Sequence, residues 1–216
     1  MPNLTRLLRA PLAAIVLLLP LTAWGGAQMY APLAASVQAA LSKAISDQVV
    51  PYLAFEDERD ARAWLSTMSQ RLAKRIPNRS VREEFLVTVH YEAKRAGLDP
   101  QLVLGVIQVE SNFRKHAVSK AGARGYMQVM PFWVKLIGTR DHNLFHLRTN
   151  LRYGCIILRH YLDIEKGNLY RALGRYNGSL GQPWYPRLVQ DALRSAWHYA
   201  DEPAGGLTTV ADRIRQ

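Results

Sequence analysis

The stretch DPQLVLGVIQVESNFRKHAVSKAGARGYMQVMP covers residues 99–131, and the rest of the fold can be worked out from it. Asp99 is a favourable N-cap residue and Pro100 suits the first helical position, so the stretch predicts a helix over residues 100–112. This helix carries one acid, Glu110, close to its C-terminal end. The glycine-punctuated residues that follow predict an irregular loop with short strands.

Glu110 lies on an apolar stripe of the predicted helix. The residues three, four and seven positions before it are Ile107, Val106 and Val103, which share its face. A carboxyl group in apolar surroundings is poorly hydrated, so its pKa rises and it can act as a proton donor near neutral pH. The alternative is a glutamate that reaches into water from the helix end, and spacing alone leaves both interpretations open.

Motifs within and after this helix follow one another in a fixed order. Glu110-Ser111 comes first, residues 125–131 read GYMQVMP, and residues 175–178 read RYNG. The ordered set resembles the lytic transglycosylases of the soluble (SLT) type, whose fold is related to goose-type lysozyme. The resemblance covers roughly residues 90–195, and several motifs in the right order are far more specific than any one of them.

The resemblance implies a mainly α, lysozyme-like helical domain with a small irregular or β loop region beside a cleft. The predicted organisation is a signal peptide (1–27), an N-terminal helical extension (28–80), the catalytic domain (81–200) and a flexible tail (201–216). Apolar spacing and stop signals predict further helices over residues 56–76, 81–96 with a Ser80 capping box, 150–166 with Asn150 as N-cap, and 184–199.

The resemblance also implies a reaction. Glu110 would be the single general acid and base that cleaves the MurNAc–GlcNAc β-1,4 bond of peptidoglycan without water, leaving a 1,6-anhydro-MurNAc end. Glycosidases ordinarily need two carboxylates. Asp141, Asp163 and Glu165 are acids in the same half of the chain, but nothing in the sequence places them in a cleft.

Five further residues receive substrate-binding roles from the resemblance: Ser111, Met127, Gln128, Tyr176 and Asn177. The serine would orient the N-acetyl region of the sugar, or else satisfy a carbonyl at the helix end. The Met-Gln pair would line the cleft. The tyrosine hydroxyl would bond the catalytic carboxyl or the N-acetyl group, and the asparagine would brace its loop or touch sugar.

Some features depart from the family or lie outside it. Arg175 stands where the family often has alanine, and it would contact a stem-peptide carboxylate or point to solvent. Gly154 inside a predicted helix indicates a close backbone contact. His142 and His146, four apart on a short loop beside Asp141, are too little for a metal site, so we expect no metal and no cofactor.

Residues 1–27 have the layout of a secretory signal peptide: Arg6 and Arg9, an apolar run over 12–19, and a small-residue end at Ala27. The apolar run is shorter than the ~20 residues that a spanning helix needs, which disfavours a retained membrane anchor. We therefore expect export to the periplasm of a Gram-negative bacterium, or membrane association if the segment is retained.

The formal net charge is +11. Such a charge attracts anionic surfaces, which fits the carboxylates of peptidoglycan stem peptides. Nucleic acid is the usual competitor, but the basic residues are dispersed and no nucleic-acid-binding signature is present. Cys155 is the only cysteine, which forbids an internal disulfide. We expect a monomer that acts on peptidoglycan glycan strands, with any envelope protein partners unknown.

Two alternatives to this enzyme remain open at the level of sequence. A goose-lysozyme-like hydrolase would use water and would need a second, correctly placed carboxylate. A non-catalytic cell-wall or secretion-apparatus binding protein would keep the fold without the chemistry, and it is disfavoured because the acid and all the cleft motifs are present.

Overall fold

The computed structural model describes residues 28–199, and in that range the chain is mainly helical, as predicted. The predicted signal peptide and the predicted tail from residue 201 onwards lie outside the described residues. In chain order the elements are α1 (Ala35–Ile45), α2 (Glu58–Leu72), α3 (Arg79–Arg95), α4 (Pro100–Ser111), α5 (Phe132–Ile137), α6 (Leu147–Ile164), α7 (Leu169–Asn177), α8 (Trp184–Ala192) and the π-helical turn η1 (Leu193–Trp197).

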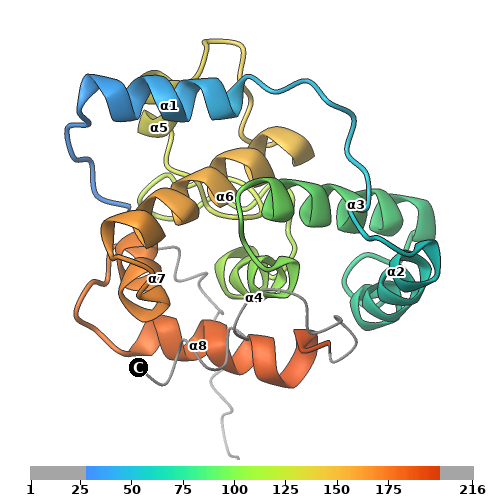
Figure 1. The fold of residues 1–216 in the computed structure, drawn as a ribbon. Coiled ribbons are helices and arrows are strands. Elements are labelled where there is room, and N and C mark those ends of the chain that lie inside the picture. Colours follow the sequence, from blue (N-terminus) through green and yellow to red (C-terminus); the bar gives the residue numbers. More distant parts are fainter. Residues whose placement is uncertain (1–27, 200–216) are drawn as a thin grey trace, which may run out of the picture.

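Helix α4 is the central element of the fold. Figure 1 shows it between α3 and α8, and it packs against both of these helices and against η1. Asp99 caps its start by accepting a hydrogen bond from the backbone N–H of Gln101, as predicted. Gly105 lets α8 approach closely, since a Cβ there would lie 3.3 Å from the carbonyl oxygen of Val189. The position of Glu110 is therefore fixed by packing on several sides.

The loop after α4 is irregular, with two isolated antiparallel bridges. Val118 pairs with Arg124, and Arg124 pairs with Val129. These short pairings match the expectation of a loop with traces of strand beside the helix. They fold the chain back on itself, so that the GYMQ motif returns toward the C-terminal end of α4.

Two predicted helix starts are wrong. Helix α3 begins at Arg79, and its N-cap is Asn78, whose side chain accepts from the N–H of Val81; Ser80 is already inside the helix. Helix α6 begins at Leu147, so Asn150 lies inside it and not at its cap. In both cases a polar residue was taken for the cap although an earlier residue begins the helix, and cap signals alone fix a helix end only to within a few residues.

Helix α1 lies on the outside of the molecule, against α5 and α6 (Figure 1). Ile45 is its one fully buried residue, so it is held less firmly than α2, which places Trp64 and Met68 in the core. Within residues 28–199 none of the helices combines the length and the apolar character needed to cross a membrane.

A buried ionic cluster holds the chain just after α1. Glu92 on α3 is fully buried and pairs with Arg95, Arg148 and Arg152. Arg152 also donates to the backbone carbonyls of Ile45 and Asp47. Because a buried charge without a partner is strongly destabilising, this cluster ties the C-terminal end of α1 to α3 and α6.

Candidate active site

Glu110 ends the buried face of α4 and is only 2% exposed. Burial among apolar residues raises its pKa from the ordinary 4.5 to about 8, so the carboxyl group carries a proton at neutral pH. The interpretation in which this glutamate reaches into water is thereby excluded. A side chain of this kind is equipped to act as a general acid.

One oxygen of Glu110 has a partner and the other does not. Its Oε1 accepts a hydrogen bond of 2.6 Å from the hydroxyl of Tyr185 on α8. Its Oε2 is buried without a hydrogen bond, and so is Nδ2 of Asn177, at the end of α7. Tyr185 and the nearby Asn177 amide both oppose the rise in pKa that burial causes.

The tyrosine beside the acid is not the one that the motif predicted. Tyr176 is buried, and its hydroxyl donates to the backbone carbonyl of Met127 at 2.7 Å, not to the carboxyl of Glu110. Tyr185 takes that place, and sequence reasoning missed it. The only signal was a tyrosine on the apolar face of the last helix, since a buried tyrosine hydroxyl usually has a hydrogen-bonding partner.

Gln128 is held in a strained backbone conformation in the loop after α4. Its φ is 49°, in the left-handed region that a residue with a side chain seldom adopts. Its Nε2 donates to the carbonyls of Ala117 and Gly125 at 3.1 and 2.9 Å, while its Oε1 is buried without a partner. Strain of this kind is typical of functional sites, and the free Oε1 leaves one acceptor for a ligand.

Met127 does not line a cleft. Its side chain is fully buried and packs on Gly154 of α6, where a Cβ would lie 2.3 Å from the sulfur. The predicted close contact at Gly154 is therefore confirmed. Asn150 fixes the same loop, because it accepts from the N–H of Met127 and donates to the carbonyls of Arg124 and Leu144, each at 2.8 Å.

Ser111 satisfies a carbonyl at the helix end, which was the second of the two roles predicted for it. Its hydroxyl donates to the carbonyl of Ile107 at 3.2 Å, one turn back in α4, and the side chain is buried. A serine in this position satisfies a helix carbonyl and does not point toward a ligand.

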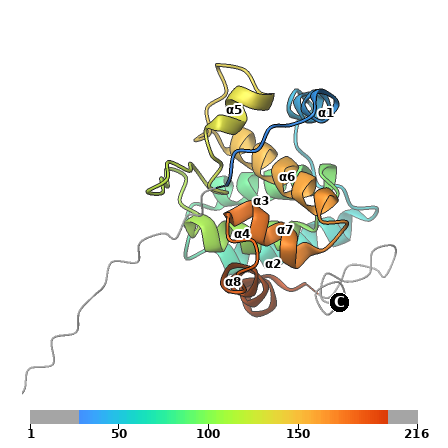
Figure 2. The same ribbon diagram turned by 90° about the vertical axis from the view of Figure 1, so that its left-hand side faces the viewer.

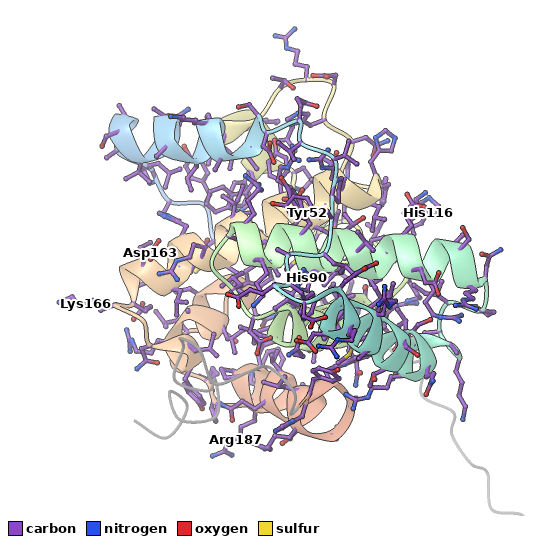
Figure 3. All side chains as sticks on the ribbon, turned by 45° about the vertical axis from the view of Figure 1, so that its right-hand side comes forward. Tyr52, His90, His116, Asp163, Lys166 and Arg187 are labelled. Carbon is purple, nitrogen blue, oxygen red and sulfur yellow. The ribbon has the colours of Figure 1, made fainter. Side chains whose placement is uncertain are left out.

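The other acids weighed from the sequence are not placed beside Glu110. Asp163 lies at the end of α6 beside Lys166 in Figure 3, and its side chain is 58% exposed. Glu165 forms ion pairs with Arg171 and Arg175. Arg175 therefore has an acidic partner within the chain, while its side chain stays 36% exposed.

Asp141 does not belong to a metal site in the described part of the chain. His142 forms a 2.7 Å hydrogen bond with the hydroxyl of Tyr153. Across residues 28–199 no group of three or more His, Cys, Asp or Glu side chains is placed to hold a metal ion.

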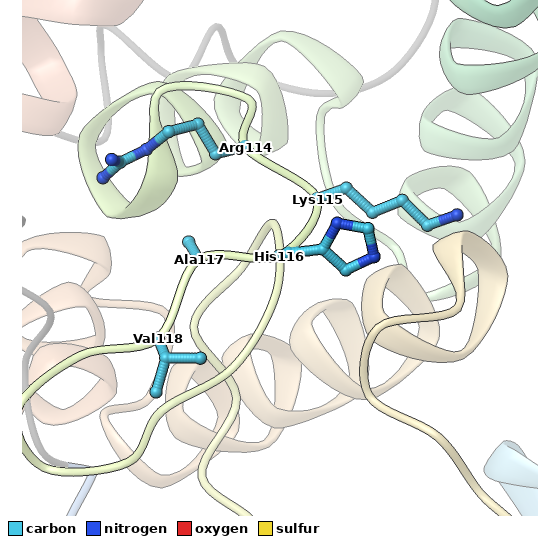
Figure 4. A pocket seen from close by; sticks show the side chains of 5 residues that line it. All are labelled: Arg114, Lys115, His116, Ala117 and Val118. Atoms are coloured by element: carbon cyan, nitrogen blue, oxygen red, sulfur yellow. The ribbon is translucent and has the colours of Figure 1, made fainter.

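A shallow pocket of about 460 Å³ lies on the loop after α4, lined by Arg114, Lys115, His116, Ala117 and Val118. Figure 4 shows that the Arg114 side chain extends to one side of the loop, whereas those of Lys115 and His116 extend to the other. The basic groups do not converge on one point, so the pocket is not a formed anion site.

Replacing Tyr185 by phenylalanine is expected to raise the pKa of Glu110 further above about 8, because the hydroxyl now stabilises the charged form. It should also cost about 1–3 kcal/mol of folding free energy, since Oε1 loses its partner. Carbon-13 NMR titration of the carboxyl group measures the first effect. Tyr176→Phe is the matched control: its hydroxyl bonds Met127, so the pKa of Glu110 should stay in place. Equal shifts in the two variants would contradict the assignment.

A model of the transglycosylase SLT domain family matches residues 88–187. A transglycosylase of Enterobacteria phage PRD1 is 36% identical over 95 residues, which cover 44% of this chain and 35% of the phage protein. The membrane-bound lytic murein transglycosylase C of Actinobacillus pleuropneumoniae serotype 5b (strain L20) is 50% identical over 48 residues, covering 22% of this chain and 13% of that protein.

Among solved structures, an inactive mutant of the lytic transglycosylase Slt from Pseudomonas aeruginosa is similar to this chain. The sequence identity is 20% and the TM-score is 0.42, and the match covers 62% of this chain and 25% of that one. This chain thus spans well under half the length of each of these relatives.

Proposed function

Residues 88–187 of this chain belong to the transglycosylase SLT domain family, and from this premise we propose that the protein is a peptidoglycan lytic transglycosylase. Its substrate is the MurNAc–GlcNAc β-1,4 bond of the glycan strand. Its product is a strand that ends in 1,6-anhydro-MurNAc, and the reaction consumes no water.

One observation carries this proposal: Glu110 is a protonated carboxyl group, and no other acid among residues 28–199 acts on its pKa. Burial sets the pKa of Glu110 at about 8, and the groups that modulate this pKa are Tyr185 and Asn177, with no second carboxylate among them. Hydrolysis by a pair of carboxylates needs the second acid within several ångströms of the first. A lone acid suits a substrate that carries its own nucleophile.

In the proposed mechanism Glu110 acts twice. Its carboxyl proton passes to the glycosidic oxygen as the bond to C1 of MurNAc breaks, and the N-acetyl group of that sugar stabilises the positive charge developing at C1. The Glu110 carboxylate then accepts the proton of the C6 hydroxyl as its oxygen bonds to C1. The proton is regained, so the enzyme returns to its starting state after each cleavage.

The neighbouring groups support both steps. Tyr185 holds Oε1, which leaves Oε2 as the atom free to exchange the proton. Asn177 and Gln128 each present a buried polar atom without a partner, an amide nitrogen and an amide oxygen respectively. Buried polar groups normally find hydrogen bonds, so these two atoms are suited to contact a sugar.

The product distinguishes the proposal from its main alternative. Purified peptidoglycan is digested with the protein, and the released fragments are examined by mass spectrometry. We expect fragments lighter by one water than the corresponding reducing-end sugars, because the C6 oxygen replaces water as the nucleophile. Reducing ends would indicate a goose-lysozyme-like hydrolase, and no release would indicate a non-catalytic wall-binding protein.

We further propose that the protein works in the cell envelope as an exported monomer. Without residues 1–27, which contain two arginines and no acid, the net charge falls from +11 to +9, and this charge favours contact with the anionic wall. The predicted signal peptide agrees with this location but lies outside the described residues. Cell fractionation tests the location, and sequencing of the mature N-terminus tests removal of the signal peptide.

A further inference from the structure

The N-terminal strap, residues 28–34, ends against the loop that carries Gln128 and Met130. In Figure 2 the segment before α1 descends past α5 and α6 toward the level of α4 and α7. At its end the side chain of Gln28 is only 3% exposed. Its Oε1 accepts a hydrogen bond of 3.2 Å from the backbone N–H of Met130, 102 residues away in the sequence.

Met130 and Tyr176 bring Gln28 close to the acid. Met130 follows Gln128 by two residues in the loop between α4 and α5. The Gln28 carboxamide is near enough to the Tyr176 hydroxyl to act on its pKa, which burial and the charge of Glu110 both raise. One buried tyrosine therefore lies within the electrostatic reach of both Gln28 and Glu110.

The group that Gln28 inserts has the chemistry of the substrate. A glutamine side chain ends in a carboxamide, with one carbonyl acceptor and N–H donors. The acetamido group on C2 of GlcNAc and MurNAc offers the same carbonyl acceptor and an N–H donor. The Nε2 of Gln28 is buried without a hydrogen bond, so the surroundings bind the carboxamide without satisfying it fully.

We propose that Gln28 occupies a subsite for the acetamido group of an N-acetylated sugar, formed by the N–H of Met130 beside Tyr176. The strap then competes with the glycan strand for the catalytic site and is displaced when the strand binds. The inference rests on the proposed function for its substrate class, N-acetylhexosamine chains.

Release of the strap from the protein surface should require little free energy. Met29 and Tyr30, the residues next to Gln28, are 73% and 61% exposed, and Tyr30 makes only an edge contact with Phe132. Ala34 caps α1 without a side-chain hydrogen bond. Apart from Leu33, which packs partly against the core, residues 29–34 are exposed, so local opening requires little free energy.

The far end of α1 remains attached when the strap opens. Gln38 donates to the carbonyl of Leu136 at 2.6 Å, and the chain after Ile45 is held by the ionic cluster around Glu92. The strap can therefore leave the subsite while α1 stays in place, which makes its return to the site an intramolecular event.

The test is binding of tri-N-acetylchitotriose to the whole protein by titration calorimetry, in the Glu110→Gln background so that no sugar is cleaved. Gln28→Ala is expected to lower Kd by about 2- to 10-fold, because the competing hydrogen bond to Met130 is gone. Gln48→Ala is the matched control, since that exposed side chain bonds only the carbonyl of Ser46. It should leave Kd as it is.

Each other outcome has a defined meaning. The inference would be overturned if Gln28→Ala bound the sugar with the same Kd as the control or with a higher Kd. A higher Kd would mean that Gln28 contributes to sugar binding. The proposed function is judged separately, by the anhydro ends that the wild-type protein releases. If anhydro ends are released but Gln28→Ala leaves Kd unchanged, only the proposal about the strap is contradicted. If Gln28→Ala lowers Kd but no anhydro ends are released, only the proposed reaction is contradicted.

Discussion

Replacement of Glu110 by glutamine is expected to slow peptidoglycan cleavage by about 10²- to 10⁴-fold, the usual contribution of a general acid or base. The amide keeps the shape of the side chain and can still accept from Tyr185, but it cannot give its proton to the glycosidic oxygen. Binding of glycan strands should persist, since the surrounding groups are unchanged. Release of soluble fragments and co-sedimentation with insoluble peptidoglycan measure the two quantities separately.

Asp163→Asn is the matched control for this loss. It also converts a carboxylate to an amide, at an exposed position where the side chain pairs with Arg159, four residues back in the same helix. We expect close to full cleavage from it. If the Glu110 variant still cut peptidoglycan at a comparable rate, the proton donor would have to be another group.

The same Glu110→Gln change is expected to stabilise the folded protein, by an amount that depends on pH. In the folded state the pKa of Glu110 is raised to about 8 from the ordinary 4.5. Between these values the folded state binds the proton more strongly than the unfolded state. Wild-type stability therefore falls as pH rises through this window, by roughly 5 kcal/mol in total.

Glutamine does not titrate. The gain in free energy of unfolding of the variant over wild type should therefore be absent near pH 4, grow through pH 6 and level off above about pH 8. Urea unfolding of wild type and variant across this range gives the difference directly, and other titrating groups cancel in it. Asp163→Asn should show no such growing advantage. Parallel pH curves for wild type and the Glu110 variant would mean that the carboxyl group ionises freely in the folded protein.

The two predictions share one cause, the burial of an ionisable group. The carboxyl group that is costly to ionise in the folded state is the one that keeps a proton for catalysis. Proteins commonly carry such a cost at functional sites, where stability is lost for the sake of chemistry. Loss of cleavage together with a gain in stability at pH 8 is therefore the joint signature to look for.

The sequence predicted what depends on neighbours along one helix. The cap at Asp99 and the apolar stripe below Glu110 follow from residues within a few positions of one another. The rise in the pKa of Glu110 was one of two interpretations that this spacing left open, and burial by the surrounding helices decided it. The close contact at Gly154 was also predicted, because a glycine inside a helix costs about 1 kcal/mol unless something needs the space. The cap, the stripe and this contact follow from helical spacing, which needs no knowledge of the rest of the chain.

The tertiary structure alone decided which distant groups meet the acid. Tyr185 lies 75 residues beyond Glu110, and Asn150 lies 23 residues beyond Met127, which is in the loop that it fixes. Gln28 reaches the site from the other end of the described chain. Motif matching pointed to Tyr176 and to the Met127 side chain, and packing gave both different partners. A buried hydrogen bond goes to whichever group the fold brings within about 3 Å, and sequence spacing carries no information about that distance.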